Sequence, residues 1–562
     1  MTDWLLKMFR FDPDFISGLD SLRTETSMKR IVLTLFAVLP LFGVLAWADE
    51  GHHHEELTSE QLGTVHFPVS CNASSQKAFE RGVALLHSFW YEEAEKEFVQ
   101  ISKDDPACAM AHWGVAMSLW HQLWDHPNAA TVKRGMEELK KAKALHPATD
   151  RERDYIAALS RFYSKKGDND ARATAYSQAM ESVYQRYADD REAAVFYALS
   201  LLASEPDGDT TFSNRKKAAA VLEPIFKTDP NHPGVAHYLI HSYDKPQLAE
   251  LGLPAARSYA RIAPAAPHAL HMPSHIFARL GLWQDDIDSN LASIAATRKT
   301  AAMHMGGEGH QFHAMDFLIY AYMQSGRETD ALRVIEEVRA LPPMKDMYGI
   351  GYDPHAYALS KFPALYALEL HHWTEAAALT PAAGGDAADK AITYWARAIG
   401  AARLGKTEEA RKDIAEMEAL RKEMLKNKKK SWASVVEDAQ KEAGAWVAHA
   451  EGKDEEAVKT LRALAESEES TGEEPEDIPA REMLADLLLE TKHPDQALVE
   501  YETDLKFNPN RFNGLYGAAN AAEQAGKNEK ASAYYAQLVK SCDGSNSDRP
   551  ELGRAKSLVA KN

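Results

Sequence analysis

A repeat of 34 residues constrains the fold of this chain more than any other feature of its sequence. Three residues of one repeat return at that spacing: Ala485, Ala497 and Tyr501 are followed by Ala519, Ala531 and Tyr535. Gly526 lies between the two halves of the second repeat, where it suits a turn between helices. A period of this length is built as helix, turn and helix, and small residues stand where neighbouring helices cross closely. The sequence therefore predicts a stack of helical hairpins.

Similar turns followed by small residues recur along most of the chain. They occur at Tyr91–Ala94, Gly281–Trp283, Gly326–Arg327, Gly405–Lys406 and Gly452–Lys453. In this respect the chain resembles the tetratricopeptide-repeat proteins, and the resemblance covers nearly all of the sequence from residue 49 onward. It implies an all-α solenoid of about ten to twelve helix hairpins, in which the first helix of each hairpin lines a concave groove. Strings at 105–114, 236–244 and 267–276 look like a bacterial group of exported tetratricopeptide proteins, which has no settled activity.

The composition agrees with a solenoid. At 562 residues the chain exceeds what one compact core accommodates, so it forms either several domains or a repeat array. Alanine, leucine and glutamate are abundant, and no stretch alternates apolar and polar residues over several candidate strands. We therefore expect helix almost throughout. The net charge of −19 and the pI of about 5.7 repel phosphate backbones, so nucleic acid is not an expected partner.

Residues 28–48 have the pattern of a secretory signal peptide. A basic pair at 29–30 precedes an apolar run over 31–45, and Ala46–Trp47–Ala48 is a small-x-small cleavage site. We expect translation to start at Met28, cleavage after Ala48, and a periplasmic or secreted product without a stable membrane span. A retained anchor is the weaker alternative because the apolar run is short and contains proline and glycine.

Export places the three cysteines in an oxidising compartment. We expect Cys71 to pair with Cys108 and Cys542 to stay unpaired. Because no CxxC pattern is present, a structural zinc site built on cysteine is not indicated.

The sequence divides into six segments, with an acidic loop expected at 466–479. They are an N-terminal extension and signal peptide (1–48), a polar lead-in (49–75), N-terminal tetratricopeptide-like repeats (76–235), central histidine-rich repeats (236–343), C-terminal repeats (344–541) and a tail (542–562).

Histidines gather in the central repeats, where eight of the chain's 23 lie between residues 237 and 313. Seven of them have helical spacing: His237, His241, His268, His271, His275, His310 and His313. At about 100° per residue, the triplet 268, 271 and 275 shares one face of a helix within roughly 60°. Asp244 falls on the face of His241, and Asp316 falls on that of His313. Three successive first helices therefore direct histidine or aspartate toward one predicted cleft.

Two interpretations of this cluster are left open by the sequence. Imidazole is a frequent ligand of zinc, copper and iron, and two histidines spaced three or four residues apart reach one ion. The nine residues named above then form a metal site, with the two aspartates as ligands or as acceptors behind them. Alternatively, the histidines hydrogen-bond one another and stiffen a peptide-binding groove. An HExxH protease is disfavoured because Tyr238 stands where the catalytic glutamate would be.

Other histidines give weaker signals. We expect His87, His112, His121 and His126 to belong to an aromatic-rich core of the first repeats, and Gly306–Gly309 to form a flexible entry to the His310 helix.

These observations predict an exported binding protein that holds a protein or peptide partner in a histidine-lined groove. A divalent transition metal (zinc, copper or iron) is an optional part of that site. A metal-dependent enzyme that uses the same histidines, hydrolytic or oxidative, is the first alternative. An assembly scaffold without a site is the second.

Overall fold

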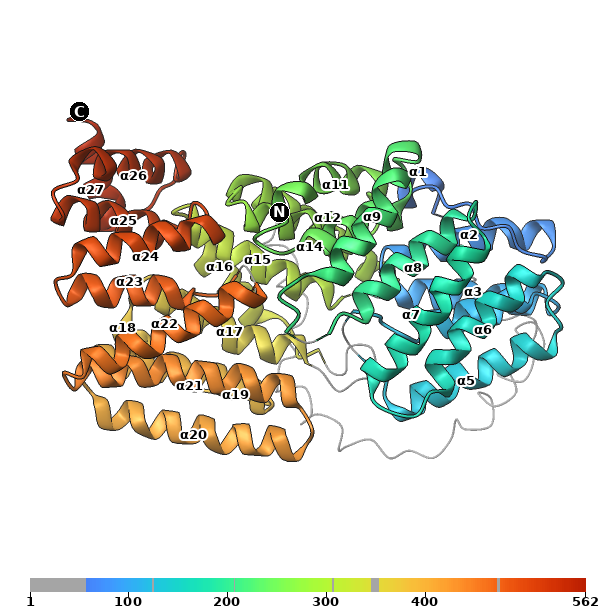
Figure 1. Cartoon of the computed structure of the whole chain (residues 1–562), viewed down its shortest axis with the longest axis horizontal. Coiled ribbons are helices and arrows are strands. Elements are labelled where there is room, and N and C mark those ends of the chain that lie inside the picture. The colour runs from blue at the N-terminus through green and yellow to red at the C-terminus, as the bar shows by residue number, and fades with distance from the viewer. Residues whose placement is uncertain are drawn as a thin grey trace, which may run out of the picture. The chain divides into compact units, whose positions relative to one another are not determined.

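The structure is a computed structural model that describes residues 57–561 except 124–125, 207, 306–307, 345–352 and 473–475. Every regular element within these ranges is a helix, from α1 to α27 (Figure 1). The signal-peptide pattern and Gly306–Gly307 lie outside the described residues. The expectations about them stay predictions. In the described part of the chain, no helix is both long and apolar enough to cross a membrane.

The first half of the described chain contains fourteen helices, of which the first is a single turn. They are α1 (Ser59–Leu62), α2 (Ala73–His87), α3 (Tyr91–Asp104), α4 (Ala109–Ser118), α5 (Ala129–Ala144), α6 (Asp150–Ser164), α7 (Asn169–Arg186), α8 (Arg191–Ala203), α9 (Ser213–Thr228), α10 (Pro233–Tyr243), α11 (Ala249–Ile262), α12 (Pro267–His271), α13 (Pro273–Arg279) and α14 (Trp283–Ala302).

The second half continues in the same way. Its helices are α15 (His310–Gln324), α16 (Glu328–Ala340), α17 (Pro354–Glu369), α18 (Trp373–Ala377), α19 (Ala387–Arg403), α20 (Thr407–Lys426), α21 (Lys430–Ala450), α22 (Asp454–Thr471), α23 (Ala480–Glu490), α24 (Pro494–Phe507), α25 (Phe512–Gln524), α26 (Asn528–Ser541) and α27 (Pro550–Val559).

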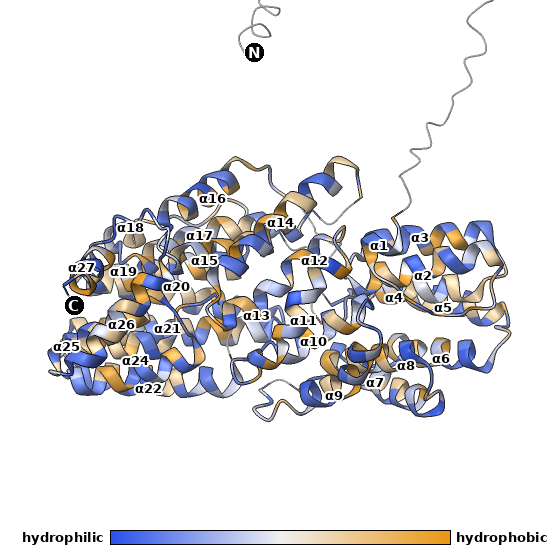
Figure 2. Cartoon of the chain, turned by 90° about the horizontal axis from the view of Figure 1, so that it is seen from above, coloured by the Kyte–Doolittle hydropathy of each residue, from blue (hydrophilic) through white to orange (hydrophobic). Residues whose placement is uncertain are grey.

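Successive helices pair as hairpins, which confirms the all-α repeat architecture. With α12 and α13 taken as one interrupted helix, the pairs run from α2/α3 to α25/α26, and α27 packs against α26. Most helices carry hydrophobic residues on one side and hydrophilic residues on the other (Figure 2). This distribution buries the apolar side against neighbouring helices and leaves the polar side in water.

Local sequence explains where helices begin and end. Asn128 caps α5, because its side chain accepts hydrogen bonds from the backbone N–H groups of Ala130 and Thr131. Gly281 ends the turn before α14 with a φ of 62°, a left-handed conformation that favours glycine. A Cβ atom on Gly281 would also meet the carbonyl oxygen of Pro509 at 2.2 Å. Only glycine therefore fits this position.

The C-terminal repeats pack against the central repeats as well as against their own neighbours in sequence. The indole N–H of Trp283 donates to the carbonyl of Asn510 at 2.9 Å, across more than two hundred residues of sequence. Arg511 is buried between the two groups of repeats, where it donates to Tyr320 and to Glu369. Hydrogen bonds between segments distant in sequence thus join the central and C-terminal repeats.

The structure adds detail to three of the expected segments, and both cysteine expectations are confirmed. The described part of the lead-in is not a polar extension, because Leu62, Val65 and Phe67 are buried in the N-terminal core. Much of the expected acidic loop at 466–479 is the end of α22, and the tail contains α27. Cys71 and Cys108 form a disulfide, and Cys542 is free and buried.

Candidate metal centre

The first helices of three successive hairpins bring the predicted histidines together. His237 and His241 lie on α10, one helical turn apart, and His313 lies on α15. His268 and His271 lie on α12, and His275 lies on α13. Pro273 interrupts the hydrogen bonding between α12 and α13, but Met272 keeps helical dihedrals (φ −51°, ψ −34°). The helical register of the histidine triplet is therefore retained across the break.

The first site, which we call site 1, consists of His237, His241 and His268. One side-chain nitrogen of each residue lies within 4.8 Å of those of the other two, and all three residues are buried. The Nε2 atom of His237 is 3.0 Å from Nε2 of His241 and 3.1 Å from Nε2 of His268. The three rings thus converge through the same type of nitrogen from two helices.

The second site, site 2, consists of His271, His275 and His313. Their nitrogens also lie within 4.8 Å of one another, and His313 is the exposed member of the three. Nε2 of His271 is 3.0 Å from Nε2 of His275. The ring centroid of His313 lies 4.4 Å from that of His271 and 5.5 Å from that of His275. Site 2 therefore repeats the arrangement of site 1 with α15 in place of α10.

Hydrogen bonds at the opposite ring nitrogens fix the orientation of three rings. Nδ1 of His237 is 2.6 Å from the main-chain carbonyl of His87, so this nitrogen carries a hydrogen and donates it. Nδ1 of His275 likewise donates to the carboxylate of Asp244 at 2.9 Å. Asp244 is held in turn by Nε of Arg279 at 3.0 Å. Such partners behind the ring are the usual support of metal-ligating histidines.

The amide of Asn290 supports His271 in the same way. Its Nδ2 donates to the main-chain carbonyl of Asp286 at 3.0 Å, which leaves Oδ1 pointing at Nδ1 of His271 at 2.7 Å. Because Oδ1 only accepts, Nδ1 of His271 must carry the hydrogen.

The same bonds place two lone pairs face to face in site 2. A neutral imidazole that carries its hydrogen on Nδ1 has a lone pair on Nε2. His271 and His275 both donate from Nδ1, and their Nε2 atoms are 3.0 Å apart. Two facing lone pairs repel at this distance unless a proton or a metal ion lies between them. A third ring, that of His313, converges on the same point, as a metal ion requires and a shared proton does not.

Burial favours the neutral form of the three site 1 rings and of His271, and the neutral form is the one that binds metal. It lowers the pKa of His237 to about 3 and that of His310 to about 4. It also holds the pKa values of His241, His268 and His271 well below the ordinary value, and the neighbouring histidines add to this effect.

Two of the predicted residues lie beside the sites rather than in them. The ring of His310 is 5.3 Å from that of His268, but His310 belongs to neither group of three. Asp316 is paired with Lys361 at 3.1 Å and accepts from the hydroxyl of Tyr357 at 3.4 Å. Asp244 acts behind His275, as described above.

The sites are neighbours because α12 and α13 contribute to both. The rings of His268 and His271 are 6.1 Å apart, and those of His241 and His275 are 6.3 Å apart. Two ions bound in the two sites would therefore both be held by histidines of α12 and α13.

A second group of buried polar residues lies behind site 1, and the sequence did not reveal it. The carboxylate of Glu192 bridges Nε2 of His87 and Nε2 of His232, each at 2.8 Å. Nδ1 of His232 accepts from the backbone N–H of Val235, and Nδ1 of His87 is 2.9 Å from the hydroxyl of Tyr238. Because the nitrogens of both rings already have protein partners, this group needs no metal ion. Its signal in the sequence is only a glutamate near the start of a mostly apolar helix, α8.

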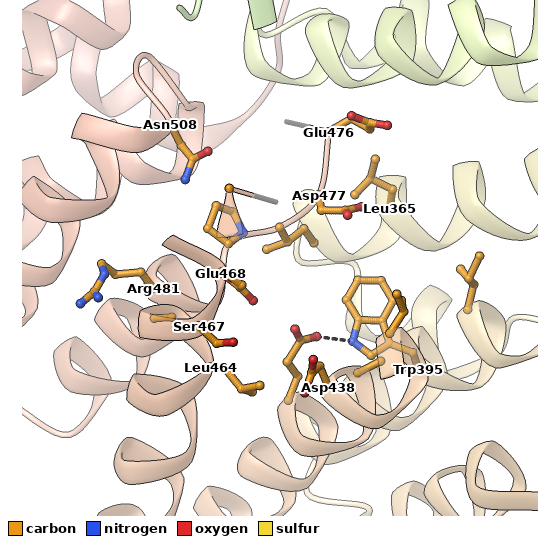
Figure 3. Close-up of a pocket in the computed structure, with 18 of the residues that line it drawn as sticks. Leu365, Trp395, Asp438, Leu464, Ser467, Glu468, Glu476, Asp477, Arg481 and Asn508 are labelled. Carbon is orange, nitrogen blue, oxygen red and sulfur yellow. Dashed lines mark hydrogen bonds between the residues drawn. The ribbon is translucent and has the colours of Figure 1, made fainter. Parts of the chain in front are cut away.

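A cavity of about 460 Å³ adjoins the basic residues that pair with Asp244 and Asp316. Its lining includes Arg279, which holds Asp244, and Lys361, which holds Asp316. Apolar side chains such as Leu365, Trp395 and Leu464 share the cavity with acidic ones (Figure 3). The indole N–H of Trp395 donates to Glu442 at 2.7 Å. A space of this size suits a small molecule or a few side chains of a partner.

No protein-family model matches the sequence, and no curated protein matches it. Among solved structures, the chain is similar to a human IFIT1 dimer with m7Gppp-AAAA, at 12% identity and a TM-score of 0.34 over 81% of this chain and 94% of that one. It is also similar to the TPR domain of P58(IPK), at 14% identity and a TM-score of 0.20 over 66% of this chain and 99% of that one. These values are too low to carry a conclusion about function. The assignment of a tetratricopeptide-like helical repeat rests on the helix pairs themselves.

Proposed function

We propose that this is an exported helical-repeat protein that binds transition-metal ions in two adjacent tri-histidine sites. The observation that carries the proposal is the 3.0 Å distance between Nε2 of His271 and Nε2 of His275, whose Nδ1 atoms both face acceptor oxygens, with His313 completing the set. Site 1 supports it, because His237 has one lone pair for two neighbouring nitrogens at 3.0 and 3.1 Å. The likeness of residues 267–276 to exported bacterial tetratricopeptide proteins is in keeping with this proposal, and so is the disulfide.

The metal content of purified protein tests this proposal. The chain should begin at Asp49, carry alanine at His52–His54, and be purified without a histidine tag, so that no other histidine run binds metal. We expect about two ions per chain for the two sites, and about one in each of the variants His237→Ala and His271→Ala. His355→Ala is the matched control, because His355 is buried, belongs to neither site and is 2.9 Å from the carbonyl of Val338.

The control should keep both ions. Absence of metal above trace amounts, or equal metal content in the control and the two site variants, would refute the proposal.

The cavity favours a second function, the binding of a peptide partner with apolar and positively charged side chains. Trp432 and Val435 line the cavity and are 40% and 59% exposed, which is unusual for large apolar residues. The acidic residues of the lining outnumber the basic ones, and Lys361 and Arg481 are already paired with carboxylates. The cavity thus offers apolar surface and negative charge.

A fluorescence titration tests this second function, with Trp395 and Trp432 as reporters. A peptide of lysine and leucine should bind, and the same peptide with glutamate in place of lysine should not. Val435→Asp should weaken binding because it places a charge in the apolar surface. Equal affinity for both peptides would contradict the proposal.

A further inference from the structure

We infer that sites 1 and 2 hold a pair of copper ions that together bind one molecule of dioxygen. This inference rests on the proposed metal binding and adds the identity of the metal, its small-molecule ligand and a reaction. It follows from the charge of the two sites, from their proximity and from their access to solvent.

The six ligands carry no charge of their own. All are imidazoles, and each site has three of them. Within the described residues, the only carboxylate hydrogen-bonded to any of the six rings is Asp244, and the guanidinium of Arg279 balances its charge. Among the described residues, the hydrogen bonds of the six rings therefore bring in no uncompensated negative charge.

This lack of negative charge disfavours a pair of divalent ions. Repulsion between two ions scales with the product of their charges, so two divalent ions repel each other about fourfold more strongly than two monovalent ions at the same distance. Burial strengthens the repulsion further, because five of the six histidines are buried. Paired iron sites in helical proteins solve this problem with several glutamates, which are missing from both sets here.

Copper satisfies the charge constraint. It is stable as a monovalent ion, unlike zinc, and imidazole is one of its usual ligands. As a divalent ion it also binds nitrogen sites more tightly than the other first-row metals. Three protein ligands per ion leave a coordination position open at each ion for an additional ligand.

Dioxygen fits those open positions without any further reactant. Each copper(I) ion gives one electron to dioxygen, which becomes peroxide and keeps its oxygen–oxygen σ bond. A copper–oxygen bond forms at each ion, both ions become copper(II), and no proton is taken up or released. Two copper(I) ions carry a charge of +2, and so does the copper(II) pair with its peroxide. A buried site with neutral ligands therefore tolerates both states equally.

Direct contact between rings of the two sites supports a ligand shared by both ions. Two ring pairs join the sites, His268 with His271 and His241 with His275, at centroid distances of 6.1 and 6.3 Å. His313 is exposed, so that dioxygen reaches site 2 from solvent.

Anaerobic loading followed by exposure to oxygen tests the inference. Full-length mature protein is freed of metal, given two equivalents of copper(I) without oxygen, and then mixed with oxygenated buffer. We expect an intense near-ultraviolet charge-transfer band, uptake of about one dioxygen per copper pair in an oxygen electrode, and an oxidised state silent in electron paramagnetic resonance because the two spins couple. His237→Ala and His271→Ala should each bind one copper and lose the band, whereas His355→Ala should keep it.

The outcomes separate this inference from the proposed function. If two copper ions bind without oxygen uptake, or give the resonance of isolated copper(II), the metal sites stand and the inference is wrong. The inference is also wrong if the single-site variants keep the full band. If neither copper nor another transition metal binds, both the inference and the proposed function fail. Circular dichroism shows that each variant is folded, and the wild-type measurement decides the matter independently of the variants.

Discussion

Replacing Arg511 with methionine is expected to lower the free energy of unfolding by about 3–5 kcal/mol, because it removes the cation from a buried ion cluster and leaves the carboxylates in place. The Arg511 side chain has an exposed fraction of 0%, and those of Glu369 and Glu482 have 1% and 2%. Nη2 of Arg511 lies 2.7 Å from a carboxylate oxygen of each. Methionine would leave both carboxylates without their shared cation, and burial already raises the pKa of Glu369.

Urea unfolding followed by circular dichroism measures this loss. Arg411→Met is the control, since the Arg411–Glu451 pair lies at the surface and should contribute much less. A triple variant that combines Arg511→Met with glutamine at 369 and 482 should recover part of the loss, because no buried charge then lacks a partner. If Arg511→Met lowers stability no more than the control, the central and C-terminal repeats are not held together by this cluster.

Two further predictions concern acid stability and helix crossing. The pKa of His237 is about 3 in the folded protein, whereas an unfolded histidine takes up a proton near pH 6.5, so the unfolded state gains protons first as the pH falls. Metal-free protein should therefore lose about 2 kcal/mol between pH 7 and pH 5 through this residue, and His237→Gln should flatten the decline in urea titrations at the two pH values. Equal declines would refute this. Gly114→Ala would put a Cβ 2.3 Å from a ring carbon of Phe98 and should lower stability by about 1–3 kcal/mol. Gly444→Ala, whose Cβ meets no described atom within 4 Å, should raise the melting temperature slightly, and a similar loss in both variants would contradict the packing.

The repeat period and the helical spacing of the histidines were sufficient to predict much of this molecule. A 34-residue period allows few folds, and the structure has the expected helix pairs. Helix geometry is regular, so His268, His271 and His275 could be placed on one face from sequence alone. The interruption at Pro273 did not disturb that face, because the residue before it keeps helical dihedrals.

The division of the histidines into two sites could not be predicted, because it depends on how the helices cross. His268 converges with His237 of α10, whereas His271 converges with His313 of α15, although one helical turn separates His268 from His271. Asp316 shares the face of His313 but is paired with Lys361, which comes from α17. Such pairings join residues far apart in sequence, and the pattern within one helix carries no information about them. The same holds for the contact of Arg511 with the central repeats.

Anomalous diffraction from a crystal of copper-loaded protein, recorded at the copper absorption edge, tests the two-site claim most directly. The account predicts two peaks per chain. One should lie about 2.0–2.1 Å from Nε2 of His237, His241 and His268, and the other should lie among the nitrogens of His271, His275 and His313 at a similar distance. A single peak, peaks away from these residues, or no peak at all with the imidazoles hydrogen-bonded to one another would contradict it.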